Sequence, residues 1–116
     1  MNKFLLIIAI ALCSFHAYAK EEIGSVDGNV VMVRVDHSGK GMVFFNINIG
    51  GTPPGCVHDS YKKAFAFDAR TDGGKAVLAF ALSAKATGSR VIAYGTGECG
   101  IYGGSVVETW DYGQLL

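Results

Sequence analysis

The stretch that decides the fold is VVMVRVDHSGKGMVFFNINI, which spans residues 30–49. Residues 30–35 and 42–49 each alternate between apolar side chains on one face and other side chains on the opposite face, which is the pattern of a β-strand. Residues 36–41 between them contain Asp, Ser and Gly, which favour turns. We therefore expect an antiparallel hairpin.

The chain after this hairpin predicts a third strand and one helix. Residues 50–55 hold two prolines and three glycines, so they are expected to form a loop. A short strand is predicted at residues 64–68. Thr71 or Asp72 then offers a helix N-cap, because its side-chain oxygen can accept a free N–H of the first turn, and Gly88 is the expected stop.

Two further strands are predicted at residues 90–94 and 105–112, separated by a glycine-rich loop at residues 95–104. Gly113 is expected to end the last strand. The order is then three strands, a helix and two strands. The simplest architecture for this order is α+β and mainly β, with one helix capping a twisted antiparallel sheet or partly open barrel.

Composition excludes several classes of protein. The chain has 116 residues, of which 50% are hydrophobic and 17% charged, with ten basic and ten acidic residues. The balanced charge argues against a dedicated nucleic-acid binder. The high apolar and low charged content argues against disorder, and the length allows one domain.

The first 19 residues predict a secretory signal peptide. Lys3 gives a positive start, an apolar run follows, and Ala17-Tyr18-Ala19 is the small-x-small pattern of a cleavage site. Cleavage after Ala19 would leave a mature domain of residues 20–116, secreted or periplasmic and without a stable membrane insertion. In an alternative interpretation, Cys13 is the lipidated cysteine of a lipoprotein.

Cys56 and Cys99 form an even pair in the mature chain. In an oxidising compartment such a pair predicts a disulfide. The alternative is a metal site in which His37 and His58 join the two cysteines, but zinc sites usually show paired short spacings and this chain has a single Cys-x-His. We expect the disulfide, with no metal and no cofactor.

The predicted helix has two apolar surfaces. At 100° per residue, the core stripe consists of Val77, Phe80, Ala81 and Ala84. Leu78 and Leu82 lie on a separate flank. This flank either packs under a loop or contacts a neighbouring subunit.

Motifs for catalysis are weak. Residues 95–100 read GTGECG, but a dinucleotide site requires a helix directly afterwards and none is predicted there. Glu98, Glu108 and Asp111 leave open a small hydrolase with a carboxylate pair, although nothing marks any two of them as that pair. We expect a non-catalytic protein.

Aromatic side chains are frequent in the last third of the chain. They pack in the core and around the disulfide in one interpretation, and form a platform for a sugar ring in the other. These residues are Tyr94, Tyr102, Trp110 and Tyr112. The alternation of Trp110 with Val106 and Tyr112 favours burial of the tryptophan.

The segment Ala66-Phe67-Asp68, the helix at residues 72–86, Gly88 and the strand at Val91-Ile92 resemble the B subunits of AB5 toxins of the subtilase-cytotoxin and pertussis type. The chain is also similar, over residues 56–100, to small secreted proteins of marine and enteric bacteria. In those proteins a cysteine precedes an aromatic-Phe-Asp segment, and a Gly-Thr-Gly-x-Cys turn follows the next strand.

This resemblance implies an OB-like fold, no catalysis, glycan or cell-surface recognition and a homo-oligomeric ring of five. Helices line the central pore of such rings, so Leu78 and Leu82 would lie at a subunit contact. The alternative function is a monomeric periplasmic protein with a structural or inhibitory role and an unknown partner.

Overall fold

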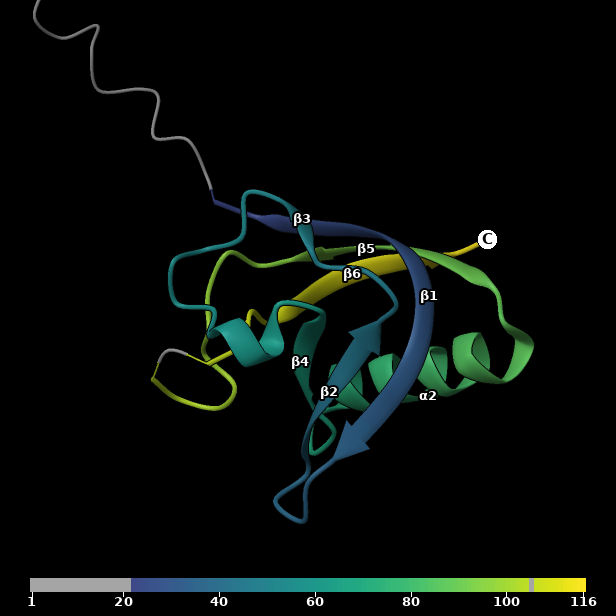
Figure 1. Ribbon diagram of the computed structural model, residues 1–116. Helices are drawn as coiled ribbons and strands as arrows, with labels where there is room; N and C mark the ends of the chain where they lie inside the picture. The colour runs from purple at the N-terminus through teal and green to yellow at the C-terminus, as the bar shows by residue number, and fades with distance from the viewer. Residues whose placement is uncertain (1–21, 105) are drawn as a thin grey trace, which may run out of the picture.

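The computed structural model describes residues 22–104 and 106–116, so the predicted signal peptide lies outside the described residues. The elements in chain order are β1 (Gly24–Val35), β2 (Lys40–Phe45), β3 (Gly50–Gly51), the short 3-10 helix η2 (Asp59–Tyr61), β4 (Ala64–Asp68), α2 (Asp72–Thr87), β5 (Arg90–Gly95) and β6 (Trp110–Leu115). The mainly β class with one long helix is confirmed (Figure 1).

One antiparallel sheet has the strand order β4-β2-β1-β5-β6, and the short β3 pairs with β1 beside this path. The strand β1 is long enough to serve both halves of the sheet. Residues 25–29 pair with β5, and residues 30–35 pair with β2 in the predicted hairpin. A bulge between Val30 and Met32 separates the two halves, and bulges bend a strand.

The sheet curls but does not close. Segment 106–109, just before β6, reaches β4 through a parallel bridge between Ala66 and Thr109. The Ala66 N–H donates to the Glu108 carbonyl over 2.8 Å. The predicted partly open arrangement is therefore confirmed.

The helix α2 begins and ends where the sequence predicts. Thr71 is the N-cap, and its hydroxyl accepts from the Gly74 N–H at 2.9 Å. Gly88 ends the helix with φ of 66°, a left-handed conformation that glycine adopts without a Cβ penalty. Gly74 is buried, and a Cβ there would overlap the Asp68 carbonyl. Glycine at this position therefore lets the first turn of α2 approach β4 closely.

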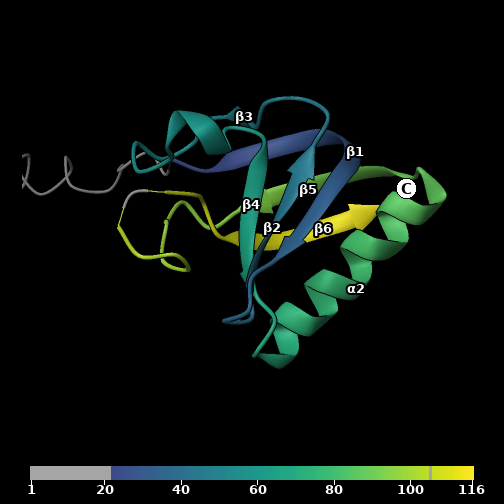
Figure 2. The ribbon, with the colours of Figure 1, turned by 60° about the horizontal axis from the view of Figure 1, so that its bottom comes forward.

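Two apolar clusters lie on opposite faces of the β2–β4 region. Beneath α2, which Figure 2 shows along one side of the sheet, Phe45, Phe65 and Val91 are fully buried. On the other face, Met42 and Val107 are buried with two alanines of β4. Apolar side chains thus cover both faces of these central strands.

The strand boundaries differ from the predictions in three places. β2 ends at Phe45 rather than residue 49, because the Asn46 side chain accepts the Asn29 N–H and the chain turns there. β1 starts at Gly24, in a polar segment expected to be a lead-in. The loop predicted at residues 50–55 contains the two residues of β3.

The last strand was predicted too early. β6 runs from Trp110 to Leu115, whereas residues 106–109 form the link to β4, and residue 105 lies outside the described residues. Gly113 lies inside the strand and does not end it. The Trp110 ring occupies the place where a Cβ of Gly113 would be, which explains a glycine in mid-strand.

Candidate functional site

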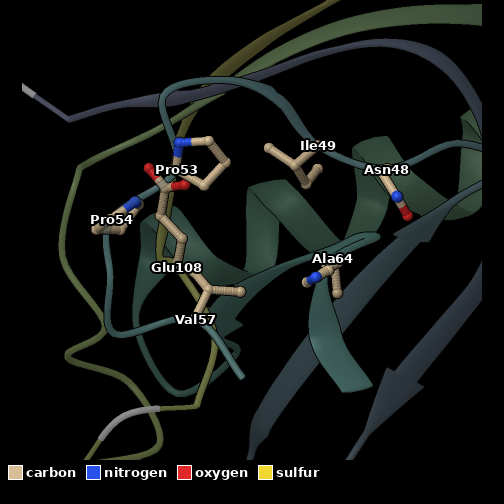
Figure 3. A pocket seen from close by; sticks show the side chains of 8 residues that line it. Asn48, Ile49, Pro53, Pro54, Val57, Ala64 and Glu108 are labelled. Atoms are coloured by element: carbon tan, nitrogen blue, oxygen red, sulfur yellow. The ribbon is translucent and has the colours of Figure 1, made fainter. Parts of the chain in front are cut away.

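A pocket of about 280 Å³ opens where the curled sheet meets the connection between β2 and β4. Its walls are mostly apolar, as Figure 3 shows. The lining consists of Asn48, Ile49, Pro53, Pro54, Val57, Lys62, Ala64 and Glu108. Mouths of barrels are common ligand sites, so we call this pocket the mouth pocket.

Glu108 is the buried charged residue at this pocket, with 1% of its surface exposed. Its Oε2 atom accepts two backbone hydrogen bonds, from the Gly24 N–H at 3.0 Å and from the Gly97 N–H at 2.9 Å. One carboxyl oxygen therefore ties the start of β1 to the loop after β5. Oε1 is also buried and has no hydrogen-bond partner among the described residues.

Two glycines make room for the carboxyl. A Cβ on Gly95 would overlap the Glu108 carboxyl group, and a Cβ on Gly24 would overlap Oε1. Both glycines lie on strands that pair with each other through neighbouring residues. These two glycines thus allow the side chain of Glu108 to approach the backbone closely.

The surroundings of Glu108 shift the pKa of its carboxyl group. Burial raises the pKa of the carboxyl above its ordinary value, because the charged form loses its hydration. The N–H groups of Gly24 and Gly97 lower the pKa again, since they stabilise the carboxylate, but the net direction is upward.

The disulfide predicted from the cysteine pair is present. Cys56 and Cys99 are bonded, with their Cα atoms 6.2 Å apart. This bond joins the connection that lines the mouth pocket to the loop that carries Gly97. Both cysteines are consumed, so the alternative metal site with His37 and His58 is not formed by these four residues. The described residues contain no cluster of three or more groups able to hold a metal ion.

The four aromatic residues predicted as a group are divided among three places. Trp110 is half-buried under α2, stacked at 6.4 Å on Phe45 and edge-on to Phe80 at 5.5 Å. Tyr102 lies elsewhere, and its hydroxyl donates to the Asp36 carboxylate. Tyr102 and Trp110 therefore do not contribute to one platform.

Tyr94 and Tyr112 form the remaining pair, with ring centroids 4.7 Å apart and planes 21° from parallel. Tyr112 is 52% exposed. The two residues are cross-strand partners on β5 and β6, and the register shift at the next pair puts Trp110 on the opposite face. The alternation of side chains along the sequence predicts Trp110 and Tyr112 on one face, because that pattern does not include the register shift.

The carboxylates of the hydrolase alternative have different environments. Glu108 is buried, whereas Glu98 and Asp111 are exposed. The hydrogen bonds that Glu108 accepts come from backbone N–H groups. Neither exposed carboxylate is paired with it through a hydrogen bond in the described residues, so nothing in this geometry singles out a catalytic pair.

The two leucines of the helix flank also differ. Leu78 is half-buried and packs against the main apolar cluster, whereas Leu82 is 51% exposed. The flank is thus divided between packing within the domain and a surface position. No helix among residues 22–104 and 106–116 is long and apolar enough to cross a membrane.

The mouth pocket itself was not predicted. Asn48, Pro53 and Lys62 belong to an irregular connection, and no periodic pattern in the sequence places them around a cavity. The available signal was Glu108 directly after the apolar residues Val106 and Val107, which indicates a carboxyl close to the core.

No protein-family model, no curated protein and no solved structure matches the chain. The resemblance to toxin B subunits therefore stays a prediction from the sequence.

Proposed function

We propose that this chain is an exported, non-catalytic binding domain that recognises a glycan on a surface, and that it acts as a B-subunit-like homo-oligomer. The observation that carries the proposal is the stacked pair formed by the exposed Tyr112 and the half-buried Tyr94. The disulfide is in keeping with an oxidising compartment outside the cytoplasm.

Two tyrosines on neighbouring strands suit a sugar ring. An aromatic face packs against the C–H groups of a pyranose, while a phenolic hydroxyl can bond to sugar hydroxyls. On the neighbouring strand pair, Asp27 and Arg90 form a bidentate ion pair with both N–O distances at 2.6 Å. Asp27 lies two residues after Ser25, the cross-strand partner of Tyr94, so Asp27 is on the same face of the sheet as Tyr94. Polar groups therefore adjoin the tyrosines.

A glycan array probed with the mature protein tests this function. We expect Tyr112→Ala to reduce the affinity for any bound glycan by about fivefold or more, because loss of a ring contact removes about 1 kcal/mol or more. The control is Val31→Ala, which shortens an equally exposed side chain on β1. An empty array, or binding equal in both variants, would contradict the proposal.

Light scattering on the mature protein tests the assembly. A mass close to five subunits is expected for a toxin-like ring. A monomer would remove the assembly and leave the alternative of a monomeric periplasmic protein.

A further inference from the structure

The mouth pocket presents an unmatched hydrogen-bonding group. Oε2 of Glu108 accepts two backbone N–H groups, whereas Oε1, on the same carboxyl, is buried without a partner. Buried polar atoms of folded proteins are nearly always paired, and an exception calls for an explanation. Because Glu108 lines the mouth pocket, a bound ligand is a direct explanation.

The chemistry of the mouth pocket limits the class of ligand that it can bind. A buried carboxylate is most fully compensated by a cation that also donates a hydrogen bond, and an ammonium group does both. The walls next to the carboxyl are apolar side chains, which suit an alkyl stem. They include Ile49, Val57 and the two prolines.

Lys62 does not oppose such a ligand strongly. Its ammonium group lies 3.2 Å from the Asp59 carboxylate, and both side chains are exposed to solvent, which screens the charge. Asn48 provides a neutral amide on the lining.

We infer that the mouth pocket binds a primary ammonium group on a short alkyl stem, with Oε1 of Glu108 accepting the ammonium hydrogen bond. This site is separate from the tyrosine pair and does not depend on the proposed glycan function. Figure 3 shows the carboxyl group between Pro53 and Pro54.

The probe is n-butylammonium, titrated into the mature, oxidised protein and followed by NMR. We expect saturable shifts at the methyl groups of Ile49 and Val57, the amide of Gly97 and the ring of Pro53, with a dissociation constant in the millimolar range, about −4 kcal/mol. n-Butanol has nearly the same shape without the charge. We expect it to bind at least tenfold more weakly.

Glu108→Gln is the decisive variant, because the side chains have nearly the same shape. The Gln amide oxygen can accept the N–H groups of Gly24 and Gly97, and its NH₂ group then replaces the acceptor Oε1 with a donor. We expect butylammonium binding to fall at least tenfold while the amide spectrum stays that of a folded domain.

A second variant keeps the test decisive if Glu108→Gln fails to fold. Val57→Phe fills the pocket from its half-buried wall and leaves Glu108 in place. Val35→Phe makes the same change at an exposed position on β1 and is the matched control. Loss of binding only in Val57→Phe supports the site.

Three results would overturn the inference. These are no saturable shifts at millimolar butylammonium, equal binding of butanol, and unchanged binding in a folded Glu108→Gln variant or, where that variant does not fold, in Val57→Phe. A glycan array without binding does not change the outcome of these three experiments, so the ammonium site and the glycan function can each fail without the other.

Discussion

The two ends of the core are held in different ways. Beneath α2, the contacts are apolar, and Phe65 packs edge-on to Phe45 and Trp110 at 6.0 and 6.1 Å. At the mouth pocket, a disulfide and one carboxyl oxygen with two backbone N–H groups connect the loops. The helix side resembles an ordinary small core, whereas the mouth depends on a few specific bonds.

The comparison concerns where a small domain leaves polar atoms unpaired. Under α2 no buried side-chain polar atom of the described residues lacks a partner, whereas the mouth contains the buried unpaired oxygen of Glu108. A covalent bond between Cys56 and Cys99 can hold the mouth loops without filling the space between them. Rigidity without dense packing is what a binding pocket requires.

The largest effect is expected from removing the disulfide. The double substitution Cys56→Ser and Cys99→Ser opens a bond between residues 43 positions apart, and the chain-entropy estimate for such a loop is about 4 kcal/mol of unfolding free energy. Denaturant unfolding measures the loss. Hydrogen exchange should accelerate first at the Gly97 amide. Equal acceleration at the Val91 amide under α2 would mean that the two ends of the core do not differ in how they are held.

An intermediate effect is expected on the helix flank. Leu78→Glu inserts a charge at a half-buried position and should lower the free energy of unfolding by about 2 kcal/mol. Leu82→Glu changes an exposed side chain and should alter stability by less than about 0.5 kcal/mol. Thermal unfolding and native mass are measured together. If Leu82→Glu leaves the mass of an oligomer unchanged, Leu82 is not at the subunit contact.

The smallest effect is expected at Glu108, and it depends on pH. Because the folded pKa is raised, the native carboxyl holds its proton more tightly than the unfolded one, and this stability is present at acid pH. It is lost as pH rises from the ordinary pKa of glutamate through the raised value, with a slope of at most about 1.4 kcal/mol per pH unit.

Glu108→Gln removes this titration. Measured at pH 4 and pH 8, the stability of the variant relative to the wild type should be higher at pH 8. A difference that is independent of pH would mean that the Glu108 carboxyl has the same pKa in the folded and unfolded chain.

The hairpin and the helix could be predicted because local rules decide them. Alternation places β1 against β2, and the Thr71 and Gly88 caps are properties of single residues. The start of β1 could not be predicted, because two of its inward positions are the glycines Gly24 and Gly28 rather than apolar side chains. These glycines leave space for side chains that come later in the sequence. Their partners, Glu108 and Asn46, are set by tertiary contacts.

The candidate sites were predicted in part. The disulfide followed from counting cysteines, and Tyr94 and Tyr112 were among the residues predicted for a platform. The separation of Trp110 from Tyr112 depends on a register shift between β5 and β6, which side-chain alternation does not report. The mouth pocket depends on how an irregular connection folds over Glu108, and that information is not local.

The bond between Gly24 and Glu108 joins residues 84 positions apart, so it spans most of the described chain. In a chain that emerges N-terminus first, whether from a ribosome or from a membrane channel, β1 appears long before its partner β5 and its tie Glu108. The first half of β1 must therefore wait for nearly the whole chain, whereas its second half can pair with β2 at once. A high contact order of this kind slows folding.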